Sequence, residues 1–390
     1  MTVLPARVLG QVQALEPVFT GLLKDLVESE SPSAHPAAHE RVRQTLAAAL
    51  DSVGYRVREV APAGGPRHLY ARPQVRRRGR PLQLVVGHFD TVWPVGTLAE
   101  RPFTVDGNVV SGPGAFDMKG GLAMLVVALR ALNQLGLEPQ LDLVIFVNAD
   151  EEIGSRSSTR HIERLARRAA RAFVLEPALG ETGALKTRRK GIGRFTITVH
   201  GKAAHAGLDP GAGASAILEL SHVIQKLFAL NDPARGITVN VGTVDGGIQP
   251  NVIAPHSTAV VDVRVPTVAD GEAIERRIQA LEPETPGVRL RIEGGIGRPS
   301  LEATPQNRRV WQLAQRTGRS LGLELEEAEA GGGSDGNTTS RFTATLDGLG
   351  PVGHGAHAPH EFLYLDRTLE RAALLAMLLL APAGQEGADP

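Results

Sequence analysis

The chain contains no cysteine in its 390 residues. This absence excludes a thiol nucleophile, a structural zinc site built from thiolates, and any disulfide bond. An excess of charge is also lacking, because 42 lysines and arginines balance 42 aspartates and glutamates. The charge balance therefore gives no indication of a nucleic acid or an anionic membrane as a partner.

Long apolar runs are missing as well. No stretch approaches the roughly 18 apolar residues of a transmembrane helix, and residues 1–31 are typical of one amphipathic helix rather than a signal peptide. We therefore expect a cytoplasmic protein with no membrane partner. The basic run RPQVRRRGRP at 72–81 is more typical of a solvated loop than of a site for an anionic partner. A nucleic-acid binder that used this run would bind in a strongly salt-dependent way.

The first part of the chain alternates strand and helix patterns. Apolar runs predict buried strands, and longer amphipathic patterns predict helices. The expected strands are 66–73, 81–90, 141–150 and 173–177, and the expected helices are 37–53, 120–136 and 162–172. This order predicts an α/β fold with a mostly parallel sheet and helices on both faces.

The pattern changes near residue 190, where strands begin to alternate apolar and polar residues. The expected order is strand, helix, strand, strand, helix, strand, at 193–202, 214–230, 238–247, 257–266, 270–281 and 288–295. This order is typical of a ferredoxin-like α+β domain. We therefore predict a discontinuous catalytic domain, 1–189 and 302–390, interrupted by an inserted domain, 190–301. The tail after residue 381 is expected to fray.

Polar residues lie at strand ends or just beyond them, where ligands bind in open α/β sheets, and one of them, Asp117, belongs to the glycine-rich turn 111–121. They are His88 and Asp90, Asp117, Glu151 and Glu152, and Glu176. Buried carboxylates need a cation, and no lysine or arginine occupies matching positions, so a metal would supply the charge. Imidazole and carboxylate suit zinc. The acids are too many for one tetrahedral ion but suit two ions that share a bridging carboxylate.

A second histidine is then needed, and the C-terminal segment offers His354, His357 and His360. Each of the other positions has an ordinary reading when taken alone. His88 could be a hydrogen-bonded core histidine, Asp117 a helix N-cap, and the paired glutamates the first turn of a surface helix. The recurrence of such groups at one edge of one sheet favours the metal site.

Nine motifs strengthen this interpretation, running in order from His88 to Glu361. They are GHFDTVWP, GPGAFDMKGG, NADEEIGS, FVLEP, GKAAHAG, QPNVIAP, DVRVP, GGGSDGN and GAHAPHE. The sequence resembles the co-catalytic zinc family of carboxypeptidases and aminoacylases. That family includes glutamate carboxypeptidase, acetylornithine deacetylase, succinyl-diaminopimelate desuccinylase and aminoacylase-1. The residues within the motifs are most similar to those of glutamate carboxypeptidase-like members.

The resemblance implies a ligand set for two zinc ions per chain, with cobalt or manganese as alternatives. His88 and Glu176 would bind one ion, and Glu152 and His357 the other. Asp117 would bridge the two ions.

The resemblance also implies roles for the groups around the ions. Asp90 would orient the imidazole of His88, and Glu151 would be the general base. The peptide bond between Asp117 and Met118 would be cis. His360 could shape the choice of substrate.

In the inserted domain, the resemblance implies residues that contact the substrate. His205 would reach the active site of a partner subunit and stabilise the oxyanion, which implies a homodimer formed through 190–301. Asn251 and Arg264 would hold the substrate carboxylate. The backbone at Gly332 and Gly333 could approach the substrate.

The sequence therefore predicts a two-zinc hydrolase that cleaves an amide bond next to a free carboxylate. The substrate would be an N-acyl amino acid, an acyl glutamate or a small peptide. An aminopeptidase for di- and tripeptides is an alternative, and it would need an acidic group for the substrate ammonium. A non-catalytic metal-binding or ligand-binding protein is disfavoured, because the predicted ligands and the general base are all present.

Overall fold

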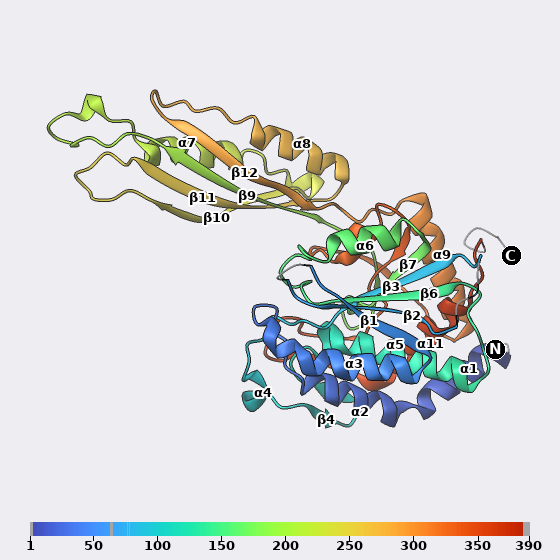
Figure 1. The fold of residues 1–390 in the computed structure, drawn as a ribbon. Helices are drawn as coiled ribbons and strands as arrows, with labels where there is room; N and C mark the ends of the chain where they lie inside the picture. The colour runs from blue at the N-terminus through green and yellow to red at the C-terminus, as the bar shows by residue number, and fades with distance from the viewer. Residues whose placement is uncertain (1–2, 63–64, 76, 78, 385–390) are drawn as a thin grey trace. The chain divides into compact units, whose positions relative to one another are not determined.

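The computed structural model describes residues 3–62, 65–75, 77 and 79–384 (Figure 1). Arg76 and Arg78 of the basic run, and the end of the expected frayed tail, lie outside the described residues. The chain forms two compact units. The first unit comprises 1–188, 303–330 and 334–390, and the second comprises 189–302 and 331–333.

The expected domain division placed the short segment Gly331–Gly333 in the catalytic domain, and the structure corrects this. In the structure it belongs to the second unit. The physical reason is local, because Arg189 Nη1 donates a hydrogen bond of 3.0 Å to the carbonyl of Gly332. The side chain of Ile192 also lies within 2.8 Å of the position that a Cβ atom on Gly333 would occupy.

The first unit is built on a central sheet of six strands among the described residues, in the order β1-β2-β6-β3-β7-β14. The pairs β6–β3, β3–β7 and β7–β14 are parallel, and β1–β2 and β2–β6 are antiparallel. The strands are β1 (Tyr55–Val60), β2 (His68–Pro73), β3 (Leu82–His88), β6 (Asp142–Asn148), β7 (Ala169–Val174) and β14 (Ala344–Leu346). The predicted mostly parallel α/β fold is confirmed.

Helices cover both faces of this sheet, as predicted (Figure 1). On one face, α5 packs against α1, α2 and α11 around a large apolar core. On the other face, α6 packs on β3 and β7 around Val86, Phe146 and Ile162. The helices of the first unit are α1 (Val3–Ala14), α2 (Glu16–Val27), α3 (Glu40–Ser52), α4 (Thr97–Glu100), α5 (Gly120–Gln134), α6 (Thr159–Ala166), α9 (Pro305–Ser320), α10 (Asp335–Thr339) and α11 (Leu365–Leu380).

Two predicted helices differ from the structure. The single helix expected over 1–31 is two helices that break at Leu15, where Pro17 starts a new first turn because it lacks the N–H of a helix interior. The helix expected over 162–172 ends at Ala166, and β7 begins at Ala169. Pairing of β7 with β3 overrides the local helical preference of the alanine-rich segment.

A smaller four-stranded sheet in the first unit, in the order β15-β16-β5-β4, supports two loops that become important below. One loop follows β5 and contains Asp117, and the other joins β15 to β16 and contains His357. The strands are β4 (Thr104–Asp106), β5 (Val109–Ser111), β15 (Gly353–His354) and β16 (Phe362–Tyr364), and a separate pair is formed by β8 (Leu185–Arg189) and β13 (Glu327–Ala330).

The second unit has the predicted ferredoxin-like order of elements. Its antiparallel sheet runs β10-β11-β9-β12, and two helices pack on the sheet around a separate apolar core. The elements are β9 (Gly191–His200), α7 (Ala216–Phe228), β10 (Thr238–Gly246), β11 (His256–Val265), α8 (Val268–Gln279) and β12 (Arg289–Arg298). Within the described residues, no helix has both the length and the apolar character needed to cross a bilayer. The cytoplasmic location stays a prediction.

Candidate metal centre

The candidate site lies at the carboxyl edge of the parallel part of the central sheet. His88 is the last residue of β3 and is level with Asn148, the last residue of β6. Glu151 and Glu152 follow in the turn after β6, and Glu176 comes just after the end of β7. Because these strands are parallel, their ends bring the side chains to the same edge.

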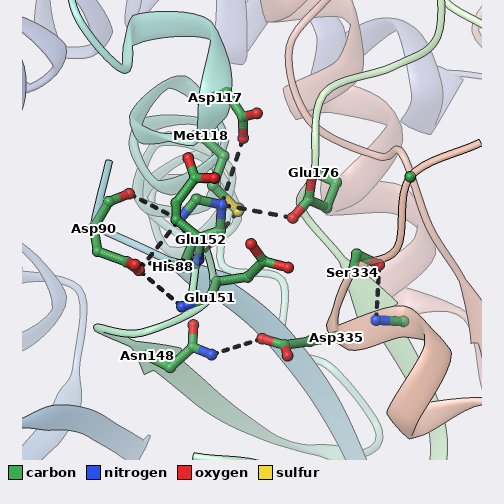
Figure 2. A network of polar contacts seen from close by, with 12 residues as sticks. His88, Asp90, Asp117, Met118, Asn148, Glu151, Glu152, Glu176, Ser334 and Asp335 are labelled. Atoms are coloured by element: carbon green, nitrogen blue, oxygen red, sulfur yellow. Dashed lines mark hydrogen bonds and ion pairs between the residues drawn. The ribbon is translucent and has the colours of Figure 1, made fainter. Parts of the chain in front are cut away.

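Asp117 lies between two histidines that come from distant parts of the chain. Its Oδ1 atom is 3.4 Å from Nε2 of His88, and its Oδ2 atom is 3.4 Å from Nε2 of His357. His88 Nε2 is also 3.6 Å from a carboxylate oxygen of Glu176. His357 Nε2 is 2.9 Å from a carboxylate oxygen of Glu152. The five side chains predicted as ligands therefore surround one small volume, and Figure 2 shows four of them converging.

Two groups of donors in this volume have the spacing that a metal ion needs. Ligand atoms of His88, Glu151 and Glu176 all lie within 4.8 Å of one another, and so do those of His88, Asp117 and Glu152. His88 Nε2 and Asp117 Oδ1 are buried, and neither makes a hydrogen bond among the described residues. Buried polar atoms without such partners are costly. The donor set of imidazoles and carboxylates, with these two orphaned atoms at its centre, fits a bound divalent cation.

In the absence of a metal ion, the clustered side chains shift one another's pKa values. Asp117 and then Glu152 raise the pKa of His357 to about 10. Burial lowers the pKa of His88, but the carboxylates of Asp117, Asp90 and Glu176 outweigh it and hold that pKa well above its usual value. Burial raises the pKa of Asp117, but the two histidines reverse this and hold it well below its usual range. The site therefore concentrates negative charge that attracts either protons or metal ions.

Comparison with known proteins shows which family the chain belongs to. Residues 84–381 match the profile of peptidase family M20/M25/M40. The chain belongs to this peptidase family. It is 26% identical over 373 residues to carboxypeptidase G2 of Pseudomonas sp. (strain RS-16), covering 94% of this chain and 89% of the relative. It is 27% identical over 341 residues to succinyl-diaminopimelate desuccinylase of Azoarcus sp. (strain BH72), covering 83% and 87%.

Solved structures share the fold. The aminopeptidase PepT of Bacillus cereus superposes with a TM-score of 0.73 at 21% identity, over 96% of this chain and 98% of that one. The YXEP protein of Bacillus subtilis, described as a dinuclear metal-binding peptidase of the M20 family, gives a TM-score of 0.67 at 16% identity, over 94% and 98%. This M20 chain is therefore a hydrolytic metallopeptidase with the fold of this family.

Asp90 contacts His88 through its backbone carbonyl as well as its carboxylate. His88 Nδ1 lies 2.9 Å from the backbone carbonyl of Asp90, whereas the nearer carboxylate oxygen is 3.5 Å away. The Asp90 carboxylate accepts hydrogen bonds of 3.2 Å from the backbone N–H groups of Glu151 and Glu152, and one of 2.7 Å from the Ser33 hydroxyl. Asp90 therefore positions the histidine and both glutamates together (Figure 2).

Glu361 is a residue that the sequence reasoning did not assign. Its carboxylate accepts hydrogen bonds from the backbone N–H groups of Gly114, Phe116 and Asp117, at 2.9, 2.9 and 3.0 Å. It also accepts one of 3.0 Å from Trp93 Nε1. Burial raises its pKa. Glu361 therefore fixes the loop that carries Asp117, and the available signal was its place at the end of the motif GAHAPHE. The peptide bond between Asp117 and Met118 is cis, as the resemblance implies.

The other residues of the C-terminal histidine segment lie at the surface. His354 and His360 are exposed, and their rings stack at 5.7 Å with an interplanar angle of 18°. His357 adopts a positive φ of 60°. The structure thus directs only His357 of the three into the ligand cluster.

Asp150, the third acid of the turn, supports the backbone after it. Its carboxylate accepts hydrogen bonds from the backbone N–H and hydroxyl of Ser157, each at 2.7 Å, and from the hydroxyl of Ser158 at 2.6 Å. Asp150 therefore stabilises the segment that leads into α6.

The substrate-binding residues predicted in the insertion belong to the second unit, where two motif loops lie side by side. His205 pairs with Val252 in an isolated bridge, and the carbonyl of Asn251 accepts a hydrogen bond of 3.0 Å from the Ala206 N–H. His205 Nδ1 accepts from the backbone N–H groups of Gly207 and Leu208, each at 3.1 Å, which directs the ring.

Arg264 of β11 already has an anionic partner in the structure. Its Nε and Nη2 atoms donate hydrogen bonds of 2.9 and 3.2 Å to the two carboxylate oxygens of Asp262. The carbonyl groups of Gly332 and Gly333 both face Nη1 of Arg189, at 3.0 and 3.4 Å. The roles of these residues toward a substrate stay predictions.

Proposed function

We propose that this metallopeptidase binds two zinc ions and cleaves an amide bond next to a free carboxylate. The substrate class is an N-acyl amino acid, an acyl glutamate or the C-terminal residue of a small peptide. The observation that carries this proposal is the position of Asp117 between His88 and His357, with Glu152 and Glu176 on either side.

The residues would divide as follows when metal is bound. His88 and Glu176 would hold one ion, Glu152 and His357 the other, and Asp117 would contact both. The ions would supply Lewis acidity, polarising the substrate carbonyl and acidifying water. Zinc suits these nitrogen and oxygen donors, and cobalt or manganese could substitute.

Glu151 would serve as the general base and acid. Its side chain is buried, and the Asp90 carboxylate holds its backbone at 3.2 Å. One of its oxygens lies within 4.8 Å of the donor atoms of His88 and Glu176. It would therefore take a proton from the attacking water and deliver it to the leaving nitrogen.

We also propose that the chain forms a homodimer through the second unit. Large apolar side chains are exposed there, with Ile217, Leu218, Ile248 and Leu208 exposed by 49%, 50%, 67% and 82%. Three of these four line or flank a hollow of about 940 Å³ between the start of α7 and the loop after β10. Such an apolar surface is typical of a protein–protein contact. A partner subunit would bring His205 to the reaction, where it would stabilise the oxyanion.

The test is a substrate panel assayed with zinc-loaded protein, with and without a chelator. It contains acetyl- and benzoyl-amino acids, aminobenzoyl-glutamate, acetylornithine and free dipeptides. We expect chelator-sensitive release of glutamate from the aryl-acyl substrate. A preference for free amino termini would indicate an aminopeptidase, and no cleavage of any substrate with two metals bound would contradict the proposal.

A single substitution tests the base. Glu151→Gln should lower kcat by about 10² to 10⁴-fold, because the amide cannot accept the proton. Metal content should be unchanged, and the exposed Glu324→Gln is the matched control. Near-full activity of Glu151→Gln with normal metal content would overturn the assignment.

A further inference from the structure

Glu151, the proposed general base, and Glu152, a proposed metal ligand, lie in a tight turn directly after β6. The N–H of Gly154 donates a hydrogen bond of 2.8 Å to the carbonyl of Glu151, and the N–H of Ser155 donates one of 2.7 Å to the carbonyl of Asp150. Ser155 adopts a positive φ of 52°, which closes the turn. The directions of both glutamate side chains therefore depend on how the two ends of this turn are held.

One carboxylate contacts both ends of the turn. Asp335 Oδ2 accepts a hydrogen bond of 2.7 Å from Nδ2 of Asn148, the residue before the turn. Asp335 Oδ1 accepts one of 2.5 Å from the hydroxyl of Ser155, the residue that closes it. Asp335 is only 2% exposed. Figure 2 shows Asn148 and Asp335 facing each other beside Glu151.

The position of Asp335 is itself fixed. It is the first residue of α10, whose N-cap is Ser334 with a capping box that includes Asn337. The Ser334 hydroxyl accepts a hydrogen bond from the Gly336 N–H and donates one to Asp347. All five residues of α10 are buried. The three glycines before Ser334 belong to the second unit, so the chain enters the first unit one residue before Asp335.

We propose that Asp335 is a positioning residue for the proposed hydrolysis, and that it acts by clamping the two ends of the turn that carries Glu151 and Glu152. This inference rests on the proposed function. The two hydrogen bonds of Asp335 reach Asn148 and Ser155, so its effect on the two glutamates passes through these residues. Loss of the clamp should loosen the general base and one metal ligand together.

Hydrogen-bond chemistry separates the possible substitutions. Asp335→Ala removes both acceptors and leaves Asn148 and Ser155 without this partner. Asp335→Asn keeps the shape, because its Oδ1 can accept from Asn148 and its amide can donate to the Ser155 oxygen. Asn148→Asp sets two carboxylates against each other, and the double variant with Asp335→Asn restores a donor opposite an acceptor.

The experiment measures kcat, KM, zinc affinity and amide hydrogen exchange of 149–157 for the wild type and these four variants. We expect Asp335→Ala and Asn148→Asp to lower kcat about 10- to 100-fold, with KM changed less than about threefold, and to weaken zinc binding by a similar factor. Asp335→Asn and the double variant should recover most of each loss. Amide hydrogen exchange in the turn should become faster only in Asp335→Ala and Asn148→Asp.

The outcomes separate this proposal from the proposed function. If the wild type cleaves no substrate, while turn exchange and zinc affinity change in the variants as described, the hydrolase assignment is refuted and the clamp is retained. Unchanged turn exchange and kcat in folded Asp335→Ala would overturn the clamp. So would failure of the double variant to improve on Asn148→Asp, because pairing would then not matter. Variants that lose stability while their folded fraction keeps full kcat would show a purely structural role.

Discussion

The carboxylate of Glu361 accepts a hydrogen bond of 3.0 Å from the backbone N–H of Asp117, 244 positions earlier in the chain. With its other bonds to Gly114, Phe116 and Trp93, this contact makes Glu361 the anchor of the loop that carries Asp117. Glu361→Gln turns an amide group toward backbone donors. We expect a loss of about 2 kcal/mol in the free energy of unfolding and metal affinity weakened about 10- to 100-fold.

Urea unfolding and metal titration would measure these two effects. The exposed Glu324→Gln is the control and should change neither. A Glu361→Gln protein with wild-type metal affinity would show that the loop holds its shape without the carboxylate.

The pH dependence of the metal-free protein follows from His357. Asp117 and Glu152 raise its folded-state pKa to about 10, from an ordinary value of 6.5. A raised folded pKa means that the stabilisation is complete below about pH 6.5 and is lost as the pH rises toward 10. We expect urea midpoints of the metal-free protein to fall between pH 7 and 10, and to fall less in His357→Asn. Equal slopes for the two proteins would refute the pairing.

Metal binding has the opposite pH dependence. At pH 7 the metal-free site holds a proton on His357, whose pKa is raised to about 10, so a cation must displace it. Calorimetry in buffers of different ionisation enthalpy should detect this proton release. Affinity should rise with pH, by about tenfold per pH unit for each proton released. A pH-independent affinity between pH 6 and 8 would contradict the assignment of the histidines as ligands.

The ion pair between Arg264 and Asp262 predicts opposite effects of two substitutions. If Arg264 holds the substrate carboxylate, Asp262 competes for the same guanidinium. Arg264→Ala should raise KM for a carboxylate substrate about tenfold or more. Asp262→Asn should lower KM by up to about fivefold, because an ion pair whose side chains are 32% and 37% exposed is worth about 1 kcal/mol or less. Changes in the same direction would indicate that Arg264 serves the fold of β11 alone.

The proposed dimer depends on an apolar surface at the start of α7. Ile217→Glu places a charge in that surface and should convert a dimer to a monomer near the chain mass of 41.3 kDa, as measured by light scattering. Val105→Glu, at a side chain of the first unit that is 46% exposed, is the control. A wild type that is already monomeric would refute the dimer, and with it the action of His205 across subunits.

The sequence allowed the edge of the sheet to be predicted, because each strand there is a buried apolar run that ends in a polar residue. His88 and Glu176 could be found in this way without any resemblance. The role of Glu361 could not, since a glutamate after a histidine-rich loop carries no periodicity. Its partners at 114–117 become visible only when β5 and β16 pair. The role of Asp335 could not be predicted for a similar reason, because α10 is a short buried helix whose neighbours lie far away in sequence.

The end of the helix after β6 illustrates a different limit. The segment at 162–172 is rich in alanine and arginine, which favours a helix. Its second half is nevertheless a strand, because β7 fills the space between β3 and β14. Local preference is weak compared with the hydrogen bonds of a central strand, so the boundary could be found only from the assembled sheet.

The ligand cluster collects residues from His88 to His357, and the last strand of the sheet, β14, comes after the whole second unit. When β7 has left the ribosome, the sheet still has one unpaired parallel edge, and the cluster lacks its predicted ligand His357. Premature termination before residue 344 leaves that edge open to pairing with other chains. We expect such fragments to aggregate and to bind zinc poorly, so that metal uptake itself marks chains whose synthesis is complete.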